Sequence, residues 1–280
     1  MTPNTHVHRA RLYKLASLAF DRPDDDLEDA LVSGEFANQL VESAAALADD
    51  QLCDHAEAVV EAAPTDPDRV DERYSDWATL FGFEKGGEIQ QYQIEYAPGT
   101  LVTSTDTLAD ISGFYKAFGL SLEPDKRERS DHLCLQLEFL SHLSLQTAAL
   151  ELDGDETGLE IVADAQGAFL EDHLGRWISR FSETMREDSG VEFYRTLAEL
   201  IERLVELDTE RFDVEPDVFA ETPPSPLEDF TDEDGTDFRC GTCGSTPSPA
   251  TDTEAGQGHA EPGQQHPEPQ PPRGDRTGPY

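Results

Sequence analysis

The sequence predicts an all-α protein whose folded part is a single helical bundle of about nine or ten helices, and three observations support this prediction. Apolar residues recur three and four residues apart through most of the first 222 residues, which is the period of an amphipathic helix. No segment shows the sustained alternation of a β-strand. No unit of about 20 to 50 residues repeats, which argues against a solenoid.

The predicted helices follow one another from the N-terminus. Residues 1–20 have helical apolar spacing and are expected to form the first core helix. Asp66-Pro67 is a strong helix start, because Asp caps a helix and Pro fits its first position. The other helices expected before the central region cover 24–32, 35–49, 52–63 and 66–81, and those after it cover 155–174, 175–186 and 191–207.

One long non-helical segment, residues 82–103, precedes the central region. It is rich in aromatic residues and contains Gly-Gly and Pro-Gly turns. Loops of this length in a compact domain are usually functional or mobile. The segment is therefore either a lid or groove wall, or an ordinary connector packed by Tyr92 and Tyr96.

The densest cluster of aromatic and ionisable residues lies in two helices expected within residues 104–150. The first has hydroxyl caps at 103–105, acidic residues near its start and Gly119 as a left-handed residue just past its end. Its apolar stripe contains Leu108, Ile111, Phe114, Tyr115 and Phe118.

The second central helix is expected to begin with Ser130 as its N-cap and Asp131 in its first turn. On that helix Asp131, Glu138 and His142 lie along one line. Three interpretations remain open. The line could ligate a metal, although a di-iron bundle requires Glu-x-x-His. It could be a Glu138–His142 pair with Asp131 as a cap. Finally, Asp131 and His132 could form a recognition patch.

The composition separates a folded domain, residues 1–222, from a tail, residues 223–280. The tail has 11 Pro and 8 Gly among its 58 residues and no periodic apolar pattern, which predicts a disordered acidic tail. Within it, Cys240 and Cys243 form a Cys-x-x-Cys that suits zinc or a dithiol. A single such pair supplies only half of a zinc site.

The chain is strongly acidic, with 60 Asp and Glu against 20 Lys and Arg, a net charge of −40. The tail contributes only −8 of this charge. Such a surface is typical of adaptation to high cytoplasmic salt, where it stays hydrated. It argues against nucleic acid and anionic membranes as partners and would suit a cationic one.

Several protein classes are excluded by missing motifs. No run of about 18 apolar residues and no secretory pattern is present, so we expect a cytoplasmic protein without membrane insertion. No phosphate-binding loop, dinucleotide fingerprint, hydrolase elbow or His-Glu-x-x-His occurs. The sequence therefore predicts neither an enzyme nor a bound cofactor.

A resemblance sharpens this interpretation. Four segments, in order, resemble the signature of the TorD/DmsD/NarJ-like family of redox-enzyme maturation chaperones: YQIEY (92–96), DISGFYKAFG (110–119), ERSDH (128–132) and LEFL (137–140). The resemblance covers about residues 70–150, and the helices on either side match only in number and length. It implies the family's helical bundle.

The resemblance implies a chaperone that binds the twin-arginine signal peptide or N-terminal region of a molybdopterin oxidoreductase precursor until cofactor insertion, acting as a monomer or weak dimer. The peptide's apolar part would lie in a groove, its arginines would meet carboxylates, and His132 would stay neutral. The alternative is a metal-responsive adaptor or regulatory protein that uses the tail cysteines. The predicted peptide-binding residues are Asp131, His132, Glu128, Glu138, Tyr115, Phe118, Phe114, Asp110 and Tyr96.

Overall fold

The computed structural model describes residues 2–67, 70–82, 89–98, 101–122 and 128–220. Within these ranges the chain is all-α, as predicted, and the only β-type pairing is an isolated bridge between Tyr92 and His132. The predicted tail, with Cys240 and Cys243, lies outside the described residues. The helices are α1 (Pro3–Phe20), α2 (Asp25–Ser33), α3 (Glu35–Leu47), α4 (Asp50–Ala62), α5 (Val70–Leu80), α6 (Leu101–Ala117), α7 (Leu133–Asp153), α8 (Glu156–Asp172), α9 (Ile178–Asp188) and α10 (Glu192–Phe212), with short 3₁₀ turns η3 (Gln93–Glu95) and η4 (Leu174–Arg176).

Helix ends follow the expected capping chemistry. The carboxylates of Asp24 and Asp49 accept hydrogen bonds from backbone N–H groups in the first turns of α2 and α4, at 2.9 and 2.8 Å. Gly119 and Gly154 have positive φ, 73° and 69°, just past α6 and α7. Glycine adopts this left-handed conformation without a steric penalty, so it ends a helix readily.

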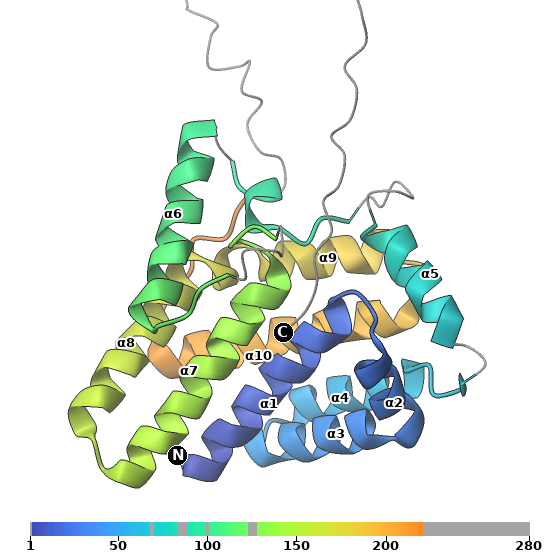
Figure 1. The fold of residues 1–280 in the computed structure, drawn as a ribbon, viewed down its shortest axis with the longest axis horizontal. Helices are drawn as coiled ribbons and strands as arrows, with labels where there is room; N and C mark the ends of the chain where they lie inside the picture. Colours follow the sequence, from blue (N-terminus) through green and yellow to red (C-terminus); the bar gives the residue numbers. More distant parts are fainter. Residues whose placement is uncertain (1, 68–69, 83–88, 99–100, 123–127, 221–280) are drawn as a thin grey trace, which may run out of the picture. The chain divides into compact units, whose positions relative to one another are not determined.

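The antiparallel pair of α1 and α7 forms the centre of the bundle (Figure 1). Ser141 Oγ donates to the carbonyl of Ala10 at 2.8 Å, and Ser17 Oγ donates to the carbonyl of Cys134 at 3.1 Å. The later residue of α1 therefore meets the earlier residue of α7, as antiparallel packing requires. Small hydroxyl side chains at these contacts let the two helices approach closely.

A buried charged group joins α1 to α10. Arg9 forms an ion pair with Asp208, whose other oxygen accepts a hydrogen bond from the Tyr13 hydroxyl at 2.6 Å. Burial lowers the pKa of Arg9 to about 10, which still leaves it charged at neutral pH. Both oxygens of Asp208 have a partner, while Nε of Arg9 is buried without a hydrogen-bond partner in the described structure.

Aromatic side chains attach α6 to the rest of the bundle. The rings of Phe114, Tyr115 and Phe118 all pack against Phe139 of α7, with ring centroids 5.1 to 6.2 Å apart. Phe139 in turn packs against Phe169 of α8 at 4.7 Å. The predicted apolar stripe is therefore part of the core, which fixes α6 beside α7 and α8.

Both central helices start at other residues than predicted, and α5 starts at Val70 instead of Asp66. The second central helix begins at Leu133 with His132 as its N-cap, so Ser130 and Asp131 precede the helix. Their side chains bond elsewhere in the fold, which explains why they do not cap it. Helix α6 begins at Leu101, so the expected hydroxyl caps at 103–105 lie inside it.

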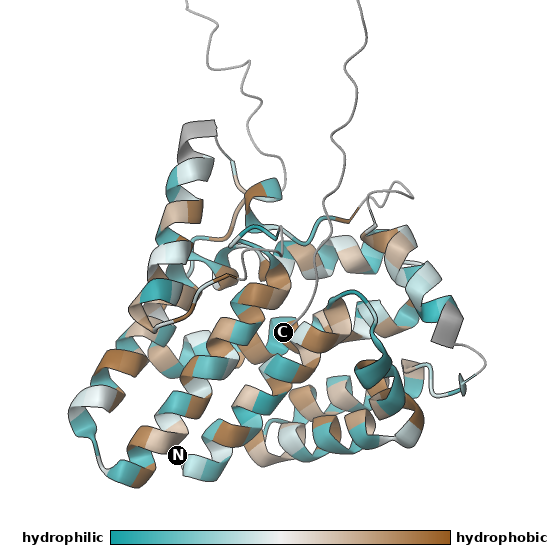
Figure 2. Cartoon of the chain, in the orientation of Figure 1, coloured by the Kyte–Doolittle hydropathy of each residue, from teal (hydrophilic) through white to brown (hydrophobic). Residues whose placement is uncertain are grey.

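Hydrophilic and hydrophobic residues alternate along the helices (Figure 2). This is the pattern of helices with one buried and one solvated face. In the described part of the chain, no helix combines the length and apolar character needed to cross a bilayer.

Candidate functional site

Two segments far apart in the sequence are held together at the ends of α1 and α7, and we call them the clasp: residues 91–95 and 128–133. The backbone N–H of Leu133 donates to the carbonyl of Gln91 at 2.8 Å. The N–H of Gln93 donates to the carbonyl of Asp131 at 3.1 Å. The clasp thus brings the first and third segments of the family signature into direct contact.

Asp131 is the central side chain of the clasp and is 0% exposed. Its two oxygens accept hydrogen bonds from the guanidinium of Arg129, both at 2.9 Å, and one also accepts from the N–H of Ile94 at 3.1 Å. Arg129 also bonds Glu95 at 3.1 Å and lies 4.3 Å over the Tyr92 ring. These hydrogen bonds, that with Asp131 first, raise the pKa of Arg129.

His132 has a defined tautomer. Its Nδ1 accepts a hydrogen bond from the N–H of Cys134 at 3.2 Å, so a neutral ring carries its proton on Nε2. Burial is the largest cause that lowers the pKa of His132 below its ordinary value. The ring also meets Tyr92 edge to face, with centroids 4.9 Å apart. The expectation of a neutral histidine at a helix start agrees with this geometry.

One cleft opens beside the clasp between the end of α1 and α5, and we call it the aromatic cleft. Its volume is about 520 Å³. Its wall is aromatic and aliphatic, while its rim carries carboxylates and the His132 ring. The lining residues are Asp21, Arg22, Tyr74, Trp77, Ala78, Phe81, Gly82, Ile89, Gln90, Gln91, Tyr92, Glu128 and His132.

The aromatic cleft already holds cations against its rings. The guanidinium of Arg22 lies 5.2 Å from the Tyr74 ring centre, and Tyr74 stacks on Trp77 with centroids 6.4 Å apart. The Tyr92 hydroxyl donates to Glu128 at 2.7 Å and so positions that carboxylate at the rim. An apolar wall beside acceptors can take a peptide in which basic and apolar residues are adjacent.

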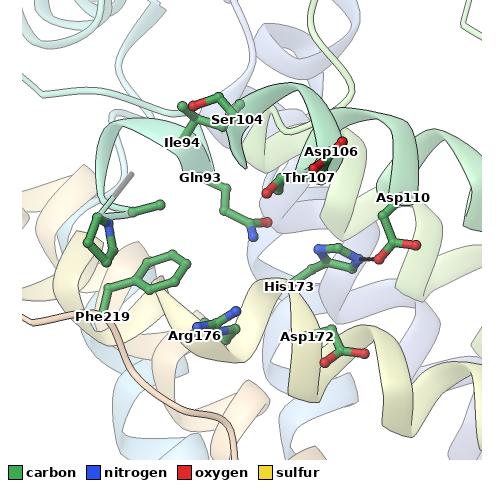
Figure 3. Close-up of a pocket in the computed structure, with 12 residues that line it drawn as sticks. Gln93, Ile94, Ser104, Asp106, Thr107, Asp110, Asp172, His173, Arg176 and Phe219 are labelled. Atoms are coloured by element: carbon green, nitrogen blue, oxygen red, sulfur yellow. Dashed lines mark ion pairs between the residues drawn. The ribbon is translucent and has the colours of Figure 1, made fainter. Parts of the chain in front are cut away.

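A second cleft opens between α6, the end of α8 and residues 93–98, and we call it the acidic cleft. Its volume is about 600 Å³. Figure 3 shows Asp106, Asp110 and Asp172 around it, with His173 between them and Phe219 on the opposite wall. The remaining lining residues are Gln93, Ile94, Ala97, Pro98, Ser104, Thr107 and Arg176.

The predicted site residues divide between these clefts and the interior. Glu128 and His132 line the aromatic cleft, and Asp110 lines the acidic cleft. Asp131 is internal and already bonded to Arg129, so it is not an open acceptor for a peptide arginine. Tyr96 packs on Trp177 at 5.3 Å and bonds the carbonyl of Gln90.

The expected groove over the aromatic stripe is corrected by burial. Tyr115 is 5% exposed, and its hydroxyl donates to the carbonyl of Ser130 at 2.9 Å. Phe114 and Phe118 are partly buried against the core. These residues support the clasp and α6 from inside, because their rings fill the space between α6 and α7.

The expected polar line on α7 is not present. Asp131 precedes the helix, Glu138 forms an ion pair with Lys14 of α1, and Nε2 of His142 is buried without a hydrogen-bond partner in the described structure. Neither the Glu138–His142 pair nor metal ligation by this line fits these contacts. No group of three His, Cys, Asp or Glu side chains in the described ranges is arranged to hold a metal.

Sequence reasoning missed the wall of the aromatic cleft and the histidine of the acidic cleft. Tyr74, Trp77 and Phe81 lie in one expected helix that the sequence did not mark as part of a site, and Tyr74 is 42% exposed. The signal that could have found them is their position just before residues 82–103, for which a groove wall was one of the two interpretations. His173 belongs to no motif, so no local pattern marks it.

Comparison with known proteins decides the family. A family model described as nitrate reductase delta subunit matches residues 35–183, more than half of the chain. The chain belongs to this family. The match confirms the resemblance to the TorD/DmsD/NarJ-like chaperones and contains the whole clasp together with α5 to α8.

Curated relatives agree with this assignment. The chain is 36% identical to a chlorate reductase assembly chaperone protein of Ideonella dechloratans, over 34% of this chain and 49% of the relative. It is 31% identical to a selenate reductase assembly chaperone protein of Thauera selenatis, over 44% of this chain and 64% of the relative. It is 28% identical to the chaperone protein TorD of Vibrio cholerae, over 58% of this chain and 74% of the relative. The chain thus spans about half to two-thirds of the first two relatives.

Proposed function

We propose that this chain is a non-enzymatic, cytoplasmic assembly chaperone for the catalytic subunit of a molybdopterin-containing oxidoreductase. Its membership of the nitrate reductase delta subunit family supports the chaperone role, as do relatives named for the assembly of chlorate and selenate reductases. The chaperone holds the precursor of the client enzyme until its cofactor is inserted.

The aromatic cleft is the proposed binding site for the twin-arginine leader of this client. The observation that carries the proposal is the combination, in one cleft, of an aromatic wall with Asp21, Glu128 and His132 at its rim. A twin-arginine leader has the matching chemistry, because two guanidinium groups precede an apolar stretch. The apolar stretch packs on Trp77 and Ile89.

Guanidinium recognition at this rim rests on close contacts. Glu128 accepts charge-assisted hydrogen bonds from a leader arginine while the Tyr92 hydroxyl holds the carboxylate in place at 2.7 Å. The contact of Arg22 with Tyr74 is an example of the second interaction, in which a guanidinium of the leader lies over an aromatic ring of the cleft wall. Such desolvated contacts resist salt screening better than long-range attraction does.

Titration with a labelled synthetic leader tests this proposal. We expect the twin-arginine peptide to bind the full chain in molar potassium chloride and a twin-glutamine peptide to bind at least about tenfold more weakly. Glu128→Gln should weaken binding of the twin-arginine peptide by about fivefold or more. The matched control is Asp172→Asn, which removes a carboxylate from the acidic cleft and should leave leader binding unchanged.

Intrinsic fluorescence adds a local readout, because the chain has only two tryptophans and Trp177 is fully buried. Leader binding should therefore change the emission of Trp77. Equal binding of both peptides, or a Glu128→Gln variant that binds like the original chain, would contradict the leader site. Recovery of a molybdopterin oxidoreductase precursor on the tagged chain would still support the chaperone role.

A further inference from the structure

The acidic cleft is built from acceptors on two elements and takes no part in the leader site. Asp106 and Asp110 lie one turn apart on α6, and Asp172 ends α8 on the other side. All three carboxylates are solvent-exposed. Carboxylates alone do not define a site on such an acidic protein, so the argument depends on what lies between them.

His173 lies between these carboxylates, and neither of its ring nitrogens makes a hydrogen bond in the described structure. The side chain is only 3% exposed, and its Nε2 is 3.1 Å from Oδ2 of Asp110. Its Nδ1 has no hydrogen-bond partner in the described structure. In Figure 3 this nitrogen is on the side of the ring that faces Gln93 and Arg176, across the cleft. A buried, unpaired ring nitrogen is costly unless a ligand or water bonds it.

The tautomer makes that nitrogen an acceptor. Burial is the largest cause that lowers the pKa of His173, so the ring is neutral near pH 7. Because Nε2 is 3.1 Å from a carboxylate oxygen of Asp110, the neutral ring carries its proton on Nε2, and Nδ1 presents a lone pair to the cleft. The cleft therefore offers one buried acceptor and the carboxylates around it to a hydrogen-bond donor.

The one cation in the lining does not neutralise the cleft. Nε of Arg176 donates to the carbonyl of Asp217 at 3.0 Å, its Nη2 is 3.7 Å from the Asp217 carboxylate, and its guanidinium lies 4.6 Å from the Phe219 ring centre. Asp106, Asp110 and Asp172 outnumber this one guanidinium, so the described lining keeps a negative balance. Phe219, Ile94 and Ala97 add apolar surface next to it.

We propose that the acidic cleft is a second binding site, which takes a lysine or arginine side chain from the mature part of the client polypeptide. The cationic head lies among Asp106, Asp172 and Nδ1 of His173, and the aliphatic stem lies along Ile94 and Phe219. The assignment to the mature part rests on the proposed function, in which the leader occupies the aromatic cleft. The proposed affinity of the acidic cleft for a basic side chain does not depend on where the leader binds.

The test uses the full chain with ¹⁵N-labelled histidine and a small probe, Nα-acetylarginine N-methylamide, followed by NMR in molar potassium chloride. We expect a saturable shift of the His173 Nδ1 resonance, and no saturable shift with the neutral isostere Nα-acetylcitrulline N-methylamide. The double variant Asp106→Asn/Asp172→Asn removes two exposed charges and should weaken binding of the arginine probe by about fivefold or more. Glu128→Gln is the matched control and should not change its affinity.

The outcomes separate this proposal from the leader site. No saturable shift, an equal shift with the citrulline compound, or unchanged binding by the double variant would overturn the acidic cleft as a cation site, whatever the leader does. A leader peptide that shifts His173 and loses affinity in the double variant would overturn the assignment to the mature client. A leader that leaves His173 unshifted while the arginine probe still binds supports two independent sites.

Discussion

The two clefts are lined by consecutive parts of one chain segment, residues 89–92 and residues 93–98, yet their surfaces differ. In the aromatic cleft, the carboxylates of Asp21 and Glu128 stand beside stacked rings. In the acidic cleft, carboxylates and an imidazole acceptor surround a polar space. The difference teaches that the aromatic cleft can select a basic residue with apolar neighbours, whereas the acidic cleft is suited to one basic side chain with its aliphatic stem.

The largest effect should come from Asp131→Ala, which removes the common support of both clefts. The substitution leaves the N–H of Ile94 without its acceptor and Arg129 without its bidentate partner. We expect a loss of about 2–4 kcal/mol in the free energy of unfolding, measured by urea denaturation at constant salt.

Asp131→Asn is the matched control, since it keeps the volume and one acceptor oxygen but removes the charge. Its destabilisation should lie between those of the original chain and Asp131→Ala. Unchanged stability of both variants would mean that the clasp does not hold the clefts together.

Tyr74→Ala should weaken ligand binding at the aromatic cleft and leave binding at the acidic cleft unchanged. Tyr74 is 42% exposed, so its truncation removes the outer ring of the aromatic wall at little cost to folding. We expect about tenfold weaker leader binding, because both the stacked ring and its cation–π contact are lost. Calorimetric titration measures the leader, and the NMR titration with the arginine probe should be unchanged. Equal losses in both titrations would indicate that the clefts are coupled.

The pH dependence of stability should involve two histidines, one in each cleft. Burial is the first cause that lowers the pKa of both His132 and His173 from 6.5, against the opposing charges of Glu128 and Asp110 respectively. Below that pH the unfolded chain binds more protons than the folded chain, so the free energy of unfolding should fall as pH drops below about 6.5.

Urea denaturation over a pH series checks this expectation. His132→Gln and His173→Gln should each reduce the loss of stability on acidification only in part, since other buried histidines shift in the same direction. A series in which neither variant changes the slope would show that these two rings do not account for the pH dependence.

Tyr92→Phe should give the smallest effect. The variant keeps the ring against His132 and Arg129 but removes the hydroxyl that positions Glu128 at 2.7 Å. We expect leader binding about two- to threefold weaker and a change in stability below about 1 kcal/mol. Leader titration of the double variant Tyr92→Phe/Glu128→Gln checks whether the effect passes through Glu128. If it does, the double variant should bind the leader no more weakly than Glu128→Gln alone.

The fold was predictable from sequence because its signals are local. Helical spacing, Asp caps and Gly119 indicated the elements, and the order of four short segments indicated the family. The site was less predictable because exposure depends on contacts between distant segments. Asp131 was expected to be open, but Ile94 and Arg129 enclose it. The wall of the aromatic cleft has the same spacing as a core stripe, and only the packing of α5 shows which face remains open.

The clasp also closes a loop of the chain. It holds Glu95 beside Arg129, so α6 lies within the segment that this contact closes. Two carboxylates of the acidic cleft lie on this loop, whereas His173 and Arg176 lie on the bundle itself. Any ligand that bridges the two must be released before α6 opens. Occupancy of the acidic cleft would therefore appear as slower amide hydrogen exchange along α6, a signal that occupancy of the aromatic cleft would not produce.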